Sequence, residues 1–338
     1  MKRIKLLLTI ILLGNYVIQA ENLISPDNNF RLDFTLNEKG EPTYSLAYKG
    51  KTVIKPSKLG FELLNAPALS AEFSTVKAET STVDETWQPV WGEVKEIRNN
   101  YNELLVVLEQ KKEKRTMKIR FRLFNDGLGF RYEFDKQANL NYFRIADEKT
   151  EFALTDNHEA FWIPGDYDTN EYYYSTTKLS KVDASKVDGE GIGTHGYFAK
   201  NAVQTPLMLK TDDKLYINIF EAALVNYPAM HLLIDKKNLI LTAALTPDAV
   251  GTKAYMQTPQ HTPWRTIIVS DKATDILASK MILNLNEPSK IADPSFIQPQ
   301  KYIGIWWGMH VPNTMSWNYA DAPNIKLNDT DWNALTPL

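Results

Sequence analysis

The chain has 338 residues, of which 43% are hydrophobic and 23% are charged, and its formal net charge is −3. This balance suggests no clustered basic face, so the sequence predicts no nucleic-acid partner. The chain contains no cysteine, which excludes disulfides, thiolate metal sites and an acylated lipoprotein start.

Residues 1–20 read as an export signal. Lys2, Arg3 and Lys5 form a basic start, the apolar run Leu6–Leu13 follows, and Ala20 is a small residue suited to a cleavage site. The apolar run is too short to cross a bilayer, which takes about 20 residues, so no transmembrane span is predicted. We expect cleavage after Ala20 and a periplasmic or outer-envelope location; an uncleaved anchor is the alternative.

Strand patterns dominate the chain after this segment. Phe30–Leu36 alternates apolar and polar residues, and Tyr44–Ile54 alternates more weakly around a turn at Lys49-Gly50. Leu104–Leu108 is a compact apolar run that also reads as a strand. Each of these patterns favours a β-strand over a helix.

The clearest hairpin spans Met117–Phe134. Its two arms alternate apolar and polar residues on either side of Asn125-Asp126-Gly127, and we expect this turn to supply positive φ angles. Leu215–Phe220 and Leu239–Leu245 predict further strands, and no long helical period occurs before about residue 290. Residues 22–290 are therefore predicted to form an all-β domain, a large antiparallel sandwich.

Residues 291–338 form a separate predicted region. The segment Pro288–Pro299 contains three prolines and reads as a linker or domain edge. The run Tyr302–Trp307 is apolar without alternation, which is typical of a parallel strand covered on both faces, as in a barrel. One such strand cannot close a barrel, so we interpret 291–338 as a linker with the first strand and loop of a truncated barrel.

Several long, tryptophan-rich motifs resemble the N-terminal domain of glycoside hydrolase family 97. The resemblance runs from about residue 22 to the end of the chain. The motifs that carry it are Glu85–Gly92, Arg120–Tyr132, Phe161–Glu171, Glu221–Val225, Thr262–Ile267 and Lys301–Trp307. Within the family, the chain looks most similar to the α-glucosidases of Bacteroidetes starch utilisation.

The resemblance implies a β-super-sandwich of galactose-mutarotase type, a catalytic (β/α)8 barrel and a small C-terminal β domain. It places this chain on the sandwich and the first barrel strand. Family enzymes cleave α-glycosidic bonds with inversion or retention, and they hold calcium in the active site. Their catalytic carboxylates lie on later barrel strands. We therefore expect no catalytic residue in this chain and no activity of the chain alone, while the intact enzyme would act on oligosaccharides.

Glu171 matches the position from which the family's sandwich reaches a calcium ion in the barrel site. Calcium takes six to eight oxygen ligands, and the remaining family ligands are barrel glutamates. One carboxylate alone makes no site, so we expect calcium in the intact enzyme and weak or no calcium binding by this chain. From the residues alone, Glu171 is an exposed loop charge, and Asp166 and Asp168 shape the loop by accepting backbone N–H groups.

Three residues at the predicted barrel strand are candidates for substrate binding, because barrel active sites lie at the carboxyl ends of the strands. Trp306 matches a sugar-contacting position of the family, Trp307 is its neighbour, and His310 is placed to hydrogen-bond a sugar hydroxyl. Packing between barrel and sandwich is the alternative for the tryptophans. The family's α-glucosidases carry an acidic residue where Gly308 stands, so the preference for glucose or galactose stays open.

Other polar and aromatic residues read as structural. Glu221 ends a predicted strand and is expected to hydrogen-bond a neighbouring loop. The tryptophans outside the predicted barrel strand read as core or interface residues, and the scattered histidines read as solvated or satisfied: Trp87, Trp91, Trp162, Trp264, His158, His195, His231 and His261.

Two other functions compete with an enzyme fragment. A free-standing sugar-binding module is the alternative, because aromatic rings make up 11% of the chain and sandwiches of this type bind sugars. An active mutarotase would need an acid and a base near the anomeric carbon, and no such pair is evident. Oligomeric state stays open.

Overall fold

The computed structural model describes residues 20–187 and 196–301. The predicted signal peptide, apart from Ala20, and the predicted barrel strand with Trp306, Trp307 and His310 lie outside these ranges. The chain divides into two compact units, 1–288 and 289–338. The first unit carries all the strands that the structure describes, so the all-β prediction is confirmed.

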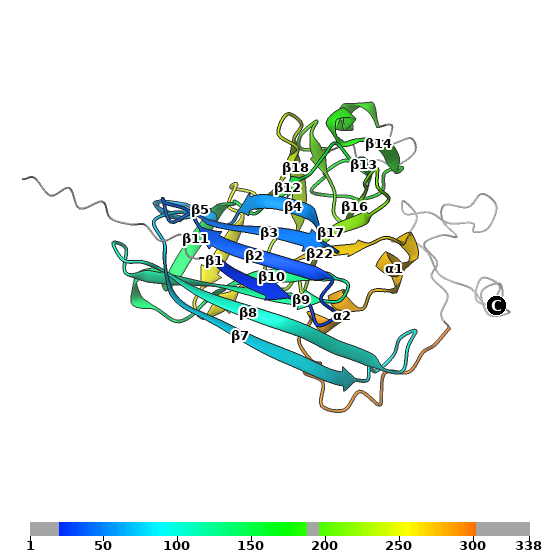
Figure 1. The fold of residues 1–338 in the computed structure, drawn as a ribbon, viewed down its shortest axis with the longest axis horizontal. Helices are drawn as coiled ribbons and strands as arrows, with labels where there is room; N and C mark the ends of the chain where they lie inside the picture. The colour runs from blue at the N-terminus through cyan, green and yellow to red at the C-terminus, as the bar shows by residue number, and fades with distance from the viewer. Residues whose placement is uncertain (1–19, 188–195, 302–338) are drawn as a thin grey trace, which may run out of the picture. The chain divides into compact units, whose positions relative to one another are not determined.

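Three antiparallel sheets make up this first unit (Figure 1). The eight-stranded sheet runs in the spatial order β1 (Ala20–Ile24), β2 (Phe30–Leu36), β3 (Pro42–Tyr48), β4 (Lys51–Lys58), β12 (Glu151–Leu154), β19 (Ile240–Leu245), β18 (Met230–Asp235) and β15 (Ala202–Val203). The four-stranded sheet runs in the order β20 (Ala254–Gln257), β11 (Tyr142–Glu148), β5 (Phe61–Leu63) and β6 (Ala66–Leu69).

The ten-stranded sheet is the largest. Its spatial order is β14 (Ser175–Lys178), β13 (Glu159–Trp162), β16 (Leu207–Lys210), β17 (Tyr216–Ala222), β22 (Trp264–Ser270), β10 (Gly127–Phe134), β9 (Arg115–Phe124), β8 (Ile97–Gln110) and β7 (Ser74–Trp87), with β21 (Gln260–His261) paired to β10. Short helices follow or connect the strands: α1 (Ala273–Ala278), α2 (Met281–Asn284) and the 3-10 turns η1 (Ala138–Leu140), η2 (Leu179–Lys181) and η3 (Ala184–Lys186).

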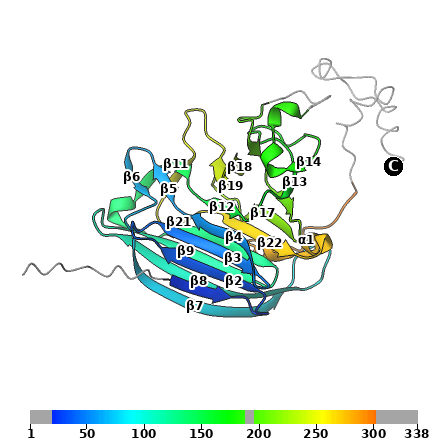
Figure 2. The same cartoon turned by 45° about the horizontal axis from the view of Figure 1, so that its top comes forward.

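The main core lies between the two large sheets. Figure 2 shows β2–β4 layered over β7–β9. Aromatic rings meet across this layer, with centroids 5.8 Å apart for Phe34 and Phe121 and 5.0 Å apart for Tyr44 and Phe130. Strand alternation explains the arrangement, because β9 buries every second residue, Phe121 among them, against the other sheet.

The opposite face of the ten-stranded sheet is covered in part by α1 and α2. A second apolar cluster joins Trp264 of β22 to Ile276, Met281 and Leu285, which lie in or beside the two helices. Gly129 of β10 permits this close approach, since a Cβ there would lie 2.7 Å from a methyl carbon of Leu285. We call this side the outer face of the sheet.

The predicted hairpin is confirmed, but its turn is built differently from the expectation. β9 and β10 flank the turn, yet neither Asn125, Asp126 nor Gly127 has a positive φ. Gly127 is required for another reason, because a Cβ there would lie 2.2 Å from the carbonyl oxygen of Ile267 on β22. The glycine therefore serves strand packing rather than turn geometry.

Candidate functional site

The loop that carries Glu171 joins β13 to β14. Glu171 is exposed, and its backbone N–H donates to Thr169 Oγ1 at 3.1 Å. The side chains of Tyr173 and Tyr174, just beyond it, are 69% and 66% exposed. The loop therefore exposes the carboxylate of Glu171 and the rings of Tyr173 and Tyr174 on the surface of the sandwich.

Asp166 organises the first half of this loop. It is only 2% exposed, and its carboxylate accepts hydrogen bonds from the Tyr172 hydroxyl at 2.5 Å, the Asp168 N–H at 2.9 Å and the Gly196 N–H at 3.0 Å. Burial opposes ionisation of Asp166, but these donors outweigh it and hold the pKa of Asp166 below its usual value. The expectation that the side chain accepts backbone N–H groups is confirmed for Asp166, whereas Asp168 takes part in this network through its own backbone N–H.

Aromatic residues and a histidine support Asp166 from behind. The Nε2 of buried His231 donates to the backbone carbonyl of Asp166 at 2.8 Å. Tyr167 stacks on Phe198 with centroids 4.4 Å apart, and both rings meet the His231 ring edge-on at 5.4 Å. Burial lowers the pKa of His231, which favours its neutral form.

The described residues do not form a complete calcium site around Glu171. No group of three or more histidine, cysteine or acidic residues within the described ranges is arranged to hold a metal ion. Calcium requires six to eight oxygen ligands, so one exposed carboxylate does not replace its hydration shell. A calcium site that includes Glu171 therefore needs more oxygen ligands than the described acidic residues supply.

A buried charge cluster lies where the three sheets meet. Arg265 is fully buried, donates to both carboxylate oxygens of Glu148 at 2.9 and 2.6 Å, and donates to Glu221 at 2.6 Å. Burial disfavours the charged form of Arg265, but the two carboxylates outweigh burial and raise its pKa. Tyr227 donates to Glu148 at 3.0 Å, and the N–H of Met230 donates to Glu221 at 3.1 Å. The printed partners of Glu221 lie on strands β18 and β22, and not on a neighbouring loop as expected. The carboxylates of Glu148 and Glu221 are therefore both held by structural hydrogen bonds and ion pairs.

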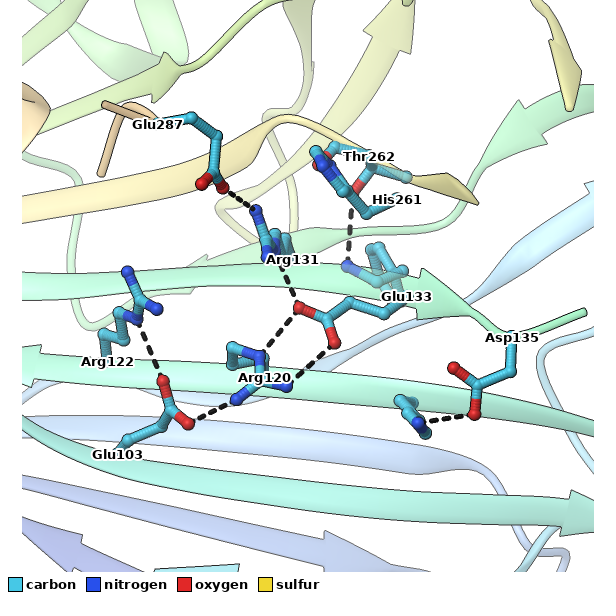
Figure 3. Close-up of polar contacts among 11 residues, drawn as sticks. Glu103, Arg120, Arg122, Arg131, Glu133, Asp135, His261, Thr262 and Glu287 are labelled. Carbon is cyan, nitrogen blue, oxygen red and sulfur yellow. Dashed lines mark hydrogen bonds and ion pairs between the residues drawn. The ribbon is translucent and has the colours of Figure 1, made fainter. Parts of the chain in front are cut away.

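A second charge network covers the outer face of the ten-stranded sheet (Figure 3). Glu133 accepts from Arg120 at 2.7 Å and from Arg131 at 2.8 Å, and Glu103 accepts from Arg120 and Arg122. Burial alone would raise the pKa of Glu133, but the two arginines outweigh burial and lower it to about 2. Glu133 is therefore ionised throughout the neutral range.

The four tryptophans of the sandwich differ in their roles. Trp264 is fully buried, and the guanidinium carbons of Arg122 and Arg131 lie 4.8 and 4.5 Å from its ring centroid. Trp162 is 2% exposed, and the Trp87 indole donates to Asn284 at 2.8 Å. Trp91 lies on the β7–β8 connection and is 54% exposed. The core interpretation is thus confirmed for Trp162 and Trp264.

A polar cleft of about 310 Å³ lies beside β17 and was not predicted. Its lining includes His158, which is 3% exposed and lies 3.2 Å from Thr155 through Nε2, and the ion pair of Lys51 with Asp213 at 2.5 Å. Burial lowers the pKa of His158. The lining sets one lysine, Lys51, against Asp156, Asp212 and Asp213, so the cleft is acidic overall.

The fold defines a large antiparallel β-sandwich domain in which Glu103, Glu133, Glu148 and Glu221 are each paired with arginines. The family model described as glycosyl-hydrolase 97 N-terminal matches residues 23–288. The chain therefore belongs to this family, and the resemblance found in the motifs is confirmed.

Relatives support the same assignment. A retaining alpha-galactosidase of Bacteroides thetaiotaomicron is 24% identical over 340 residues, covering 91% of this chain and 47% of the relative. A glycoside hydrolase family 97 enzyme from a Pseudoalteromonas species, solved in complex with acarbose, is 38% identical with a TM-score of 0.76. That match covers 86% of this chain and 41% of the enzyme, so the chain spans less than half of the relatives it matches.

Two further solved structures extend the comparison. A variant of the Pseudoalteromonas enzyme in complex with panose is also 38% identical, with a TM-score of 0.75. A beta-arabinopyranosidase is 20% identical with a TM-score of 0.62, covering 74% of this chain and 40% of that chain, and it shares the fold.

Proposed function

We propose that this chain is the N-terminal, sandwich-bearing portion of an α-glycosidase, an α-glucosidase or α-galactosidase, that acts on oligosaccharides. The family match over residues 23–288 carries the proposal. The 38% identity to an enzyme solved with acarbose, and with panose as a variant, supports a saccharide as the ligand class. We further propose export to the periplasm or outer envelope after cleavage at Ala20, which would leave Glu21 of β1 paired with Phe34.

Calcium belongs to this proposal as a ligand of the intact enzyme. Glu171 supplies one carboxylate from an exposed loop position, and residues outside the described ranges complete the coordination. We assign sugar binding in the intact enzyme to Trp306, Trp307 and His310. Calcium would supply a fixed positive charge there, and Glu171 would help to hold the ion in position.

Bond cleavage itself is assigned outside the sandwich. Glycoside hydrolysis needs a carboxylic acid and a carboxylate that both reach the scissile bond. Glu148 and Glu221 are buried against Arg265, and the pKa of Glu133 is about 2, which removes it as a proton donor at neutral pH. The buried carboxylates of the described sandwich therefore have structural roles. We expect the chain alone to be inactive.

Hydrolysis assays with nitrophenyl α-glucoside and α-galactoside, with and without calcium, test this assignment on the 338-residue chain. The expected result is no turnover with either substrate. Turnover that disappears when a carboxylate within residues 20–301 is changed to its amide would overturn the assignment.

Calorimetric titration with panose and acarbose tests the saccharide class. Binding that strengthens with calcium and weakens in Glu171→Gln supports the proposed site, and Asp168→Asn is the matched control on the same loop. Saccharide binding that ignores both calcium and Glu171→Gln would favour the alternative, a free-standing sugar-binding module.

A further inference from the structure

The loop that presents Glu171 is closed at its base by the pairing of β13 with β14, and a side chain closes it again nearer its tip. Asp166 and Tyr172 join across the loop through the hydroxyl–carboxylate bond of 2.5 Å, and Asp168 N–H binds the other carboxylate oxygen at 2.9 Å. Glu171 lies immediately before Tyr172 in the chain. A rearrangement of Asp166 would therefore release the backbone next to Glu171.

Asp166 is itself held on its other side. Its backbone carbonyl accepts from His231 of β18 at 2.8 Å, and Gly165 next to it pairs with Ala202 and Phe198 through backbone bonds of 3.0 Å. A Cβ at Gly165 would lie 2.9 Å from both Ala202 Cβ and a ring carbon of Phe198, so the loop lies tightly against its support. The rigid sandwich thus fixes Asp166, and Asp166 fixes the loop.

We propose that Asp166, supported by His231, is a positioning residue that holds the loop 164–174 in the conformation that presents Glu171. The inference rests on the proposed metal-ligand role of Glu171. Hydrogen bonds to an ionised carboxylate are among the stronger ones in proteins, and three of them converge here. A loop ordered before its ligand arrives loses less conformational entropy on binding, which strengthens the interaction.

Hydrogen exchange of peptides covering residues 164–174 tests the positioning role directly. Asp166→Asn removes the charged acceptor, and we expect exchange in this loop to become about tenfold faster. Asp168→Asn is the matched control, because it makes the same chemical change at an exposed position of the same loop, and it should leave exchange unchanged. Equal exchange in Asp166→Asn and wild type would overturn the proposal.

Tyr172→Phe is a second variant in case Asp166→Asn does not fold, as judged by circular dichroism. It removes one donor and keeps the carboxylate, so exchange should again become faster, by less than in Asp166→Asn. Unchanged exchange in Tyr172→Phe would contradict the closure of the loop by this pair.

Calcium titration of the same variants of the intact enzyme, which carries the remaining ligands, separates the two levels of the inference. Weaker calcium binding in both Glu171→Gln and Asp166→Asn supports positioning for the metal. Weaker binding in Glu171→Gln alone would overturn the role of Asp166, even if the loop exchanges faster. Absence of calcium binding by the wild type at millimolar calcium would contradict the role of Glu171, while the exchange measurement still decides whether Asp166 fixes the loop.

Discussion

Ionisation of Glu133 makes the stability contributed by the outer-face charge network depend on pH. Its pKa is lowered from 4.5 to about 2 in the folded protein, so its stabilising effect is complete above pH 4.5 and is lost as the pH falls towards 2. With the side chain 15% exposed, the effect amounts to about 3 kcal/mol, and more than half of it is lost by pH 3. Urea unfolding at pH 6 and pH 3 should therefore show a steep loss of stability.

Glu133→Gln should be less stable at pH 6 and should lose less stability between pH 6 and pH 3 than the wild type. Glu62→Gln, at an exposed position of β5, is the control and should keep the wild-type slope. A wild-type slope in Glu133→Gln would contradict the assignment of this pH dependence to Glu133.

Arg265 is the residue whose loss should be most damaging. Arg265→Met leaves Glu148 and Glu221 buried without their cation, and breaking a buried pair in this way costs about 3–5 kcal/mol. Arg31→Met removes an exposed ion pair with Asp33 on β2, which water screens, so it should cost far less stability than Arg265→Met. Guanidinium unfolding of both variants measures the difference, and equal losses would rule out a special role for the buried cluster.

At the scale of elements, the contact of β10 with β22 depends on Gly127. Gly127→Ala would place a Cβ 2.2 Å from a backbone oxygen of β22, so the two strands must separate at a cost of about 2–3 kcal/mol. Gly50→Ala is the control, since a Cβ there meets no atom within 4 Å and only the φ of +77° is strained, at about 1 kcal/mol. Thermal unfolding of the two variants should rank them in this order.

The sequence predicted strands where side chains alternate. β2 matches the predicted Phe30–Leu36, and β19 lies within the predicted Leu239–Leu245. It did not predict β7, because this strand is polar along its length and pairs with β8 alone at the edge of the sheet. Nor does any local pattern place β12 between β4 and β19, since those partners come from distant parts of the chain.

The candidate site was predictable in part for the same reason. Asp166 was assigned from local spacing, because two of the three donors to its carboxylate, Asp168 and Tyr172, are close in sequence. The Arg265 cluster was missed, since its partners lie 117 and 44 residues away. One signal was present: an arginine inside the apolar strand Trp264–Ser270, all of whose residues are buried, requires buried carboxylates.

For the molecule as a whole, the sandwich should fold without the second unit. Both apolar clusters lie entirely within residues 23–285, so a fragment of residues 21–288 retains the complete core. We expect this fragment to unfold in urea in one cooperative transition with the midpoint of the 338-residue chain. A broad transition, or a clearly lower midpoint, would show that residues beyond 288 contribute to the stability of the sandwich.

The central place of β22 has a consequence for biosynthesis. β22 lies between β17 and β10, so it joins the two halves of the ten-stranded sheet, and it brings Arg265 to carboxylates made earlier. During translation, Glu148 and Glu221 leave the ribosome well before Arg265, the cation that neutralises them. Until β22 emerges, the edges of β17 and β10 that it will pair with remain unpaired. Completion of the domain is thereby postponed to nearly the last step of its translation, and a chain released before Trp264 would expose unpaired strand edges to aggregation.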